Sequence, residues 1–113
     1  NGYLITEGWV KKVEKSLDWL TLSIDSLNEE SLKKIGRSSG RKVLSKQDYI
    51  YRINLLKKYN IKFKMNTVVN TYNHNEDISS FVEKVKPLRW KVFQVLPINN
   101  SGKRSILSMV FLF

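Results

Sequence analysis

The feature that most constrains the fold is the alternation of helical and extended segments along the chain. Apolar residues recur at helical spacing in some segments and at every second position in others, which predicts helices and strands respectively. In chain order, we expect a helix over 5–17, a strand over 19–25, a helix over 45–59, a strand over 61–69, a helix over 76–85 and a strand over 89–96. Consecutive strands joined by helical crossovers lie parallel, with right-handed connections. The pattern therefore predicts an α/β fold around a parallel sheet.

Local residue choices support these boundaries. Thr6 is suited to cap the first helix, and Ser45 with Asp48 three positions later forms a variant of the capping box ahead of the second. A short helical turn is expected over 28–35, and the Gly- and Ser-rich stretch over 36–42 is typical of a loop. The tryptophans are expected in the core or packed against helices: Trp9, Trp19 and Trp90.

The length of 113 residues corresponds to one domain at most. Three parallel strands leave sheet edges exposed, so a sheet of this size is a poor independent domain. The first residue is not Met, and no signal peptide follows it. We therefore expect residues 1–98 to be an internal part of a larger barrel or doubly wound domain. Residues 99–113 form a polar loop and an apolar tail, which is either a further strand or an unrelated end.

Composition excludes several kinds of site from this chain. Without cysteine there are no disulfides, no cysteine-ligated zinc and no iron–sulfur ligands. The single histidine, His74, cannot form a metal site alone, and its polar surroundings predict that it is exposed. The formal net charge of +10 is compatible with a nucleic acid, an anionic membrane or a polyphosphate as partner. Most lysines in the predicted helices are expected to face solvent.

Cations occupy strand positions that are normally apolar. Lys64 and Asn66 share one face of the second predicted strand, and Arg89 and Lys91 share one face of the third. Both faces of a parallel sheet are usually buried, and a buried cation without a partner is costly. Asp25 is the one acidic residue of the predicted strands. We therefore expect a bound polyphosphate, held by lysine point charges and an arginine fork, with a solvated sheet edge as the alternative.

Four segments of the chain, in matching order and spacing, resemble the viperin family of radical S-adenosylmethionine (SAM) enzymes. They are LTLSIDS at 20–26, IGR at 35–37, FKMNTVVN at 63–70 and RWKVFQVL at 89–96. The resemblance extends over residues 1–98 and does not include the tail. It implies the middle part of a partial (β/α)₆ radical SAM barrel.

The resemblance also implies an activity. Members of the family use a [4Fe–4S] cluster to cleave SAM reductively, and the resulting 5′-deoxyadenosyl radical takes a hydrogen atom from the ribose of CTP. Loss of water then gives 3′-deoxy-3′,4′-didehydro-CTP, an antiviral chain terminator, so the enzyme is a lyase. The cysteine loop that holds the cluster in the family is absent from this chain, and we expect the chain alone to be inactive.

Partners and location follow from the same resemblance. The implied cofactors are SAM and the [4Fe–4S] cluster. The implied partners are an electron donor and a nucleoside triphosphate, for which CTP is the first candidate. No stable complex with nucleic acid is expected. The cytoplasm is the expected location. The cytoplasmic face of the endoplasmic reticulum and lipid droplets is the alternative for members that carry an amphipathic N-terminal helix.

Several residues fall on binding positions of the family. They are Ser23 and Arg37 at SAM, Lys64, Asn66 and Lys91 at the nucleotide, and Arg89 as a basic neighbour of the nucleotide site. The resemblance implies that the lysines hold the triphosphate. It assigns no catalytic residue and no metal ligand to this chain. Thr71 stands where the family commonly has a basic residue, so a preference for UTP or another nucleotide is left open.

Two other functions are compatible with the sequence. The first is a basic, non-catalytic module that binds nucleotides or nucleic acid. It predicts an exposed stripe of cations with aromatic stacking residues, and binding that depends steeply on salt. The second is a different radical SAM enzyme on the same barrel, because a fold alone does not determine the substrate.

Overall fold

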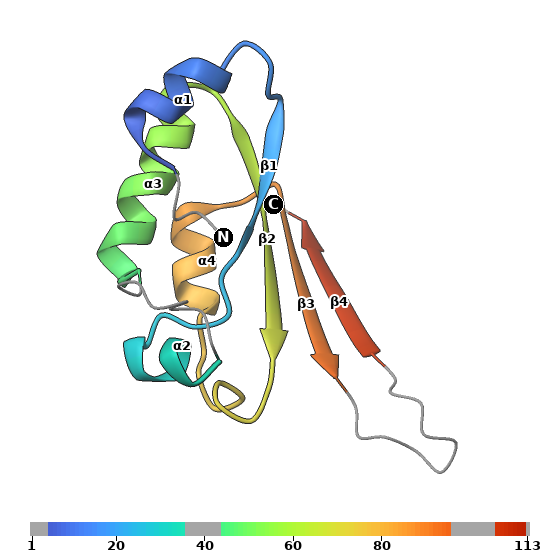
Figure 1. Ribbon diagram of the computed structural model, residues 1–113. Helices are drawn as coiled ribbons and strands as arrows, with labels where there is room; N and C mark the ends of the chain where they lie inside the picture. The colour runs from blue at the N-terminus through green and yellow to red at the C-terminus, as the bar shows by residue number, and fades with distance from the viewer. Residues whose placement is uncertain (1–4, 36–43, 96–105, 113) are drawn as a thin grey trace.

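The computed structural model describes residues 5–35, 44–95 and 106–112 (Figure 1). Its helices and strands follow the expected alternation, and the segment predicted as a helical turn is a short helix. In chain order the elements are α1 (Glu7–Val13), β1 (Trp19–Ser23), α2 (Glu29–Ile35), α3 (Lys46–Lys58), β2 (Lys62–Val69), α4 (Ser79–Val85), β3 (Arg89–Val95) and β4 (Ile106–Leu112). None of the helices in this described part is long and apolar enough to cross a membrane.

The strands form one sheet in the order β1-β2-β3-β4. The first three strands are parallel, which confirms the predicted α/β fold and its helical crossovers. β4 runs antiparallel to β3 and takes the edge beside it (Figure 1). The apolar run near the C-terminus is therefore a strand, and the described sheet has one strand more than the three predicted with crossovers.

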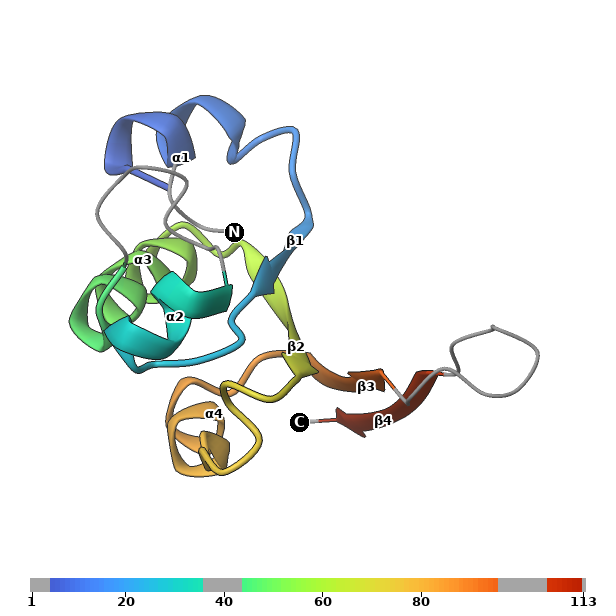
Figure 2. The same ribbon diagram turned by 60° about the horizontal axis from the view of Figure 1, so that its bottom comes forward.

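The described helices lie on one side of the sheet (Figures 1 and 2). The core forms between these helices and the strand residues that face them. Burial alternates along β2, where Phe63, Met65 and Thr67 are buried and the residues between them are not. The buried apolar side chains without exposed surface are Val10, Ile24, Leu32, Ile53, Leu56, Met65 and Val82. No described helix covers the opposite face of the sheet.

The predicted helix caps are present. The Thr6 hydroxyl accepts a hydrogen bond from the backbone N–H of Trp9 at 3.2 Å. Ser45 and Asp48 form the expected capping box: the Ser45 hydroxyl accepts from the Asp48 N–H at 3.1 Å, and the Asp48 carboxylate accepts from the Ser45 N–H at 2.9 Å. These local bonds satisfy backbone donors that a helix start leaves without partners.

The fourth helix begins later than the predicted range of 76–85. Asp77 accepts a hydrogen bond from the Ser79 backbone N–H at 2.9 Å, and this turn delays the helix until Ser79. Asp side chains compete with helical hydrogen bonding in this way near helix starts. The expected apolar side of the helix is nevertheless correct, because Phe81, Val82 and Val85 are all buried.

The tryptophans differ in their burial. Trp9 and Trp90 are partly buried and pack against the core, as expected. The prediction is wrong for Trp19, whose side chain is 48% exposed. Alternation along β1 turns Leu20 and Leu22 toward the helices and leaves Trp19 on the opposite face. Hydrophobicity alone predicted burial, but the strand period determined the direction of this side chain.

Candidate functional site

The candidate site is the sheet face that the described helices leave uncovered. Side chains alternate along each strand, so the residues between the buried positions of β1, β2 and β3 point to this face. In the parallel register Ser23 pairs with Asn66, and Asn66 pairs with Lys91, so these three residues lie in one row across the sheet. Lys64 lies two residues toward the N-terminal end of β2, where it pairs with Thr21.

The remaining two predicted site residues differ in their placement. Arg89 lies two residues before Lys91 and shares its face of β3. Arg37 lies outside the described residues, and its place at SAM stays a prediction. The fold therefore brings Ser23 together with the predicted nucleotide residues on one face, although β1, β2 and β3 are far apart in the sequence.

Two residues of this face contain buried polar atoms without a hydrogen-bond partner among the described residues. They are Oδ1 of Asn66 and Nε of Arg89. Leaving such a group unpaired costs about 1–3 kcal/mol, so most buried polar groups in native proteins have a partner. The amide oxygen accepts hydrogen bonds and the guanidinium nitrogen donates them. An acceptor and a donor of this face are therefore left without a partner among the described residues.

The lysines of this face contact aromatic rings. Lys64 Nζ lies 3.6 Å from the centroid of the Trp19 ring, and Lys91 Nζ lies 5.1 Å from that of Phe93. Ion pairs between described residues involve helix side chains instead, as in the contact of Lys58 with Glu7 at 3.2 Å. Within the described part of the chain, the cations of the open face therefore have no acidic partner.

Asp25, the one acidic residue of the predicted strands, binds the backbone of the neighbouring strand. It is buried, and its Oδ1 accepts a hydrogen bond from the Val68 N–H at 2.9 Å. Asn73 donates from Nδ2 to the carbonyl oxygens of Asp25 at 2.7 Å and of Val68 at 2.9 Å. These bonds join the segment after β1 to the end of β2, and so support the register that aligns the candidate site.

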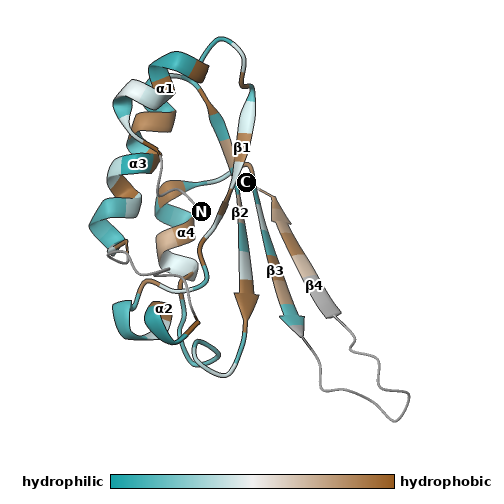
Figure 3. Ribbon diagram, in the orientation of Figure 1, coloured by the Kyte–Doolittle hydropathy of each residue, from teal (hydrophilic) through white to brown (hydrophobic). Residues whose placement is uncertain are grey.

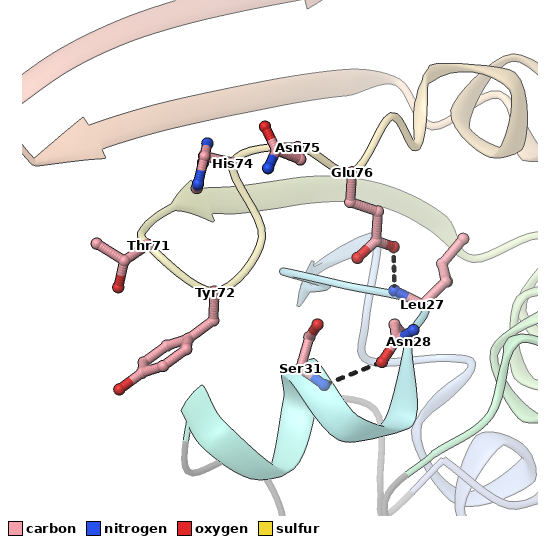
Figure 4. Close-up of a pocket in the computed structure, with 8 residues that line it drawn as sticks. All are labelled: Leu27, Asn28, Ser31, Thr71, Tyr72, His74, Asn75 and Glu76. Carbon is pink, nitrogen blue, oxygen red and sulfur yellow. Dashed lines mark hydrogen bonds between the residues drawn. The ribbon is translucent and has the colours of Figure 1, made fainter.

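A pocket of about 440 Å³ lies beyond the C-terminal ends of β1 and β2 (Figure 4). The Glu76 carboxylate joins the two loops that form it, because it accepts hydrogen bonds from the Leu27 N–H at 2.8 Å and from the Ser26 hydroxyl. His74 is exposed, as predicted. The residues that line the pocket are Leu27, Asn28, Ser31, Thr71, Tyr72, His74, Asn75 and Glu76.

Sequence reasoning missed the aromatic residues of the open face and the role of Glu76. The period of two that singled out Lys64 and Lys91 also places Trp19 and Phe93 on their face, so this signal was present in the sequence. No comparable signal predicts the contact of Glu76 with the loop after β1, because it joins segments that are distant in the chain.

The residues present do not fit an iron–sulfur cluster. The sequence has no cysteine, and the described residues contain no group of three or more His, Cys, Asp or Glu that could hold a metal ion. For SAM, the open face offers the half-buried hydroxyl of Ser23 beside the Asn66 amide. The described part of the chain is therefore suited to binding an anionic or hydrogen-bonding ligand rather than a metal.

Several curated proteins are similar to this chain over 94% of its length. An S-adenosylmethionine-dependent nucleotide dehydratase of Lacinutrix mariniflava is 45% identical over 107 residues, and one of Flammeovirga pacifica is 40% identical over 106. The S-adenosylmethionine-dependent nucleotide dehydratase RSAD2 of Danio rerio is 43% identical over 109 residues. The chain spans 22%, 37% and 30% of the lengths of these relatives, in that order. No protein-family model matches the chain.

Proposed function

We propose that this chain binds the nucleotide substrate of a longer enzyme, and that this substrate is CTP. The chain is homologous to a segment of the S-adenosylmethionine-dependent nucleotide dehydratases of the viperin family. The open sheet face carries the argument. Its lysines and arginine lack acidic partners among the described residues. A triphosphate carries about four negative charges, so several neighbouring cations match it.

The residues of the face have different tasks in this proposal. Lys64 and Lys91 hold the triphosphate as point charges, and Arg89 presents paired N–H donors to phosphate oxygens. The side-chain amide of Asn66, whose Oδ1 is buried without a partner among the described residues, turns to accept a hydrogen bond from a ribose hydroxyl. Ser23, beside Asn66 in the register, contacts SAM.

The complete reaction is proposed for the longer enzyme. Bound SAM would supply the radical that takes a hydrogen atom from the ribose of CTP. Loss of the 3′-hydroxyl as water would then need one proton and one electron, the latter from the electron donor, and would give the antiviral nucleotide 3′-deoxy-3′,4′-didehydro-CTP. The residues of this chain bind the triphosphate and orient the ribose, which lowers the entropic part of the barrier. The cluster ligands lie outside these residues, because the chain has no cysteine. An electron donor and a cytoplasmic location belong to the same proposal.

The open face is proposed to line the interior of a partial (β/α)₆ barrel, with residues 1–98 as an internal part of that domain. Helices on one face of a parallel sheet are compatible with this arrangement (Figure 2). A parallel barrel adds a further parallel strand beside β3, whereas β4 pairs there in the antiparallel direction. This supports treating residues 99–113 as a segment separate from the barrel.

A single-stranded nucleic acid is the second candidate ligand. It is favoured by the exposed Trp19 ring beside Lys64, because aromatic rings next to cations stack bases and attract phosphates. This candidate predicts that binding weakens steeply as salt increases and that many oligonucleotides bind alike. The triphosphate proposal predicts selective binding of CTP instead.

Titration calorimetry on the longer enzyme that contains this segment tests the proposal. The ligands are CTP, UTP, ATP, inorganic triphosphate and a single-stranded oligonucleotide at two salt concentrations. Replacing Lys64 or Lys91 with Gln is expected to weaken CTP binding about tenfold, because each removes one charge-assisted contact. Lys84→Gln is the matched control, since Lys84 is exposed on α4 and the charge change is the same.

Two results would contradict the proposal. Equal losses for Lys64→Gln, Lys91→Gln and Lys84→Gln would mean that only net charge matters. Tighter binding of the oligonucleotide than of any triphosphate would favour the nucleic-acid module. An anaerobic assay of the longer enzyme with CTP and UTP then decides the substrate.

A further inference from the structure

We infer that Trp19 is a positioning residue, which holds the Lys64 ammonium in place for the anionic ligand. This inference rests on the proposed function, because it assumes that Lys64 binds a phosphate. Trp19, which was expected to lie in the core, thereby becomes part of the proposed binding site. The main observation is the distance of 3.6 Å between Lys64 Nζ and the centroid of the Trp19 ring. Contacts within about 6 Å of a ring centroid are attractive, and tryptophan gives the strongest of them.

The position of Trp19 supports a role outside the core. Trp19 is the first residue of β1 and pairs with Lys62, whereas Lys64 pairs with Thr21. The Lys64 side chain therefore extends along the sheet toward the N-terminal end of the strands to reach the ring. Because 48% of the Trp19 side chain is exposed on the open face, packing of the described core does not account for a tryptophan there.

Lys91 provides a contrast on the same face. Its ammonium lies 5.1 Å from the Phe93 ring, a longer contact with a weaker aromatic partner. Phe93 lies two residues after Lys91 along β3. Trp19 instead lies two residues before Thr21, the register partner of Lys64, and so nearer the N-terminal end of the sheet. The two lysines thus lean in opposite directions along the parallel strands. Each ring stabilises a cation that has no acidic partner among the described residues, and the two like charges are kept apart.

This arrangement has a consequence for affinity. A free lysine has a flexible four-carbon chain and loses rotamer entropy when it is fixed by a ligand. Trp19 restrains that chain before the ligand arrives, so less entropy is lost on binding. One face of an ammonium can contact the ring while its other protons bind phosphate oxygens. Removing the ring while keeping an apolar side chain is therefore expected to weaken triphosphate binding about two- to fivefold.

The experiment is a double-mutant cycle with inorganic triphosphate as the probe. In the longer enzyme, Trp19→Leu is expected to weaken binding about two- to fivefold when Lys64 is present and to have no effect in the Lys64→Gln background. Trp19→Phe is expected to recover part of the loss, since it keeps an aromatic ring. Tyr72→Leu is the matched control, because Tyr72 is also an exposed aromatic residue but lies in the loop after β2.

A spectroscopic readout separates a positioning role from a structural one. In a chain labelled with 5-fluorotryptophan, the Trp19 fluorine resonance is expected to move as triphosphate saturates the site. It is also expected to move when Lys64 is replaced in the absence of ligand. The inference about Trp19 would be wrong if Trp19→Leu left the affinity unchanged, or if it weakened binding equally with and without the Lys64→Gln substitution. Either result would leave the proposed function standing. Failure of the longer enzyme to bind triphosphate would overturn the proposed function, and this inference with it.

Discussion

At the scale of single residues, Thr67 links the parallel strands of the described sheet. It is buried, and its hydroxyl donates a hydrogen bond to the Ile24 carbonyl oxygen at 2.7 Å and accepts one from the Trp90 indole N–H at 3.0 Å. β2 thereby contacts the segment after β1 on one side and β3 on the other. The period of two placed Thr67 on the buried face, but only the structure shows which groups it binds.

Thr67→Val is expected to lower the free energy of unfolding by about 1–3 kcal/mol. Valine has a similar shape, but it leaves a buried carbonyl and a partly buried indole N–H without their partner. Urea denaturation followed by tryptophan fluorescence measures this change. Thr71→Val is the matched control, because Thr71 is exposed and its change should be close to neutral. Equal effects of the two substitutions would show that the hydroxyl contacts of Thr67 contribute little.

Asp77 provides a pH prediction at the same scale. Hydrogen bonds from the Ser79 hydroxyl and then the Ser79 backbone N–H lower the pKa of its carboxyl below the ordinary value of 3.8. Because the folded pKa is the lower one, the stabilisation is present above the unfolded pKa and is lost as pH falls through the folded pKa. Ser79→Ala is expected to raise the pKa of Asp77 toward its ordinary value. A carboxyl NMR titration measures it, and an unchanged pKa would contradict the assignment of the hydroxyl as the main cause.

At the scale of elements, β4 is an apolar edge strand. Its exposed side chains are Met109, Val110, Phe111 and Leu112, with exposed fractions of 60%, 50%, 41% and 79%. Phe111 stacks on Trp90 with their ring centroids 5.2 Å apart, which attaches the strand to β3. Figure 3 shows the hydrophobic colouring along β4. Exposed edges of this kind pair with other chains, because their backbone donors and acceptors lack partners.

Met109→Lys is therefore expected to reduce self-association of the chain. A charge on an edge strand disfavours pairing with a second edge, and Met109 is well exposed and lies opposite Val92. Size-exclusion chromatography with light scattering measures the mass across a concentration series. Met109→Leu is the matched control that keeps the apolar surface. A monomeric wild-type chain at all concentrations would contradict the prediction.

At the scale of the whole molecule, the candidate site depends on three strands that meet only in the folded chain. We expect the isolated chain to be loosely folded and prone to aggregate, because one sheet face lacks a cover among the described elements. A ligand that binds only the folded state stabilises it by about 2.7 kcal/mol at one hundred times its Kd. Inorganic triphosphate is therefore expected to raise the melting temperature of the wild-type chain.

Differential scanning fluorimetry with increasing triphosphate measures this shift. The double variant Lys64→Gln, Lys91→Gln should lose most of it, whereas the matched double variant Lys57→Gln, Lys84→Gln, on exposed helix positions, should keep it. A cooperative transition and a monomeric elution profile without ligand would count against the expected loose fold. The same shift in both double variants would indicate a general effect of charge.

Much of the architecture could be predicted from local patterns. Periodicity identified the strands and helices, and short-range residue choices identified the Thr6 cap and the capping box of Ser45 and Asp48. Periodicity and cap residues can be read without tertiary information, because they reflect backbone geometry and contacts between residues close in sequence. The resemblance to the viperin family is confirmed by the similar proteins. The barrel, the CTP substrate and the roles of the site residues stay predictions.

The sequence by itself determined which residues share a strand face, and so placed Lys64 with Asn66 and Arg89 with Lys91. Only the tertiary structure decided that the helices leave this face open, that Ser23 joins the row, and that Trp19 contacts Lys64. It also decided that β4 pairs with β3. The physical reason is that strand alternation is a local property, whereas register and coverage depend on packing between segments that are distant in the chain.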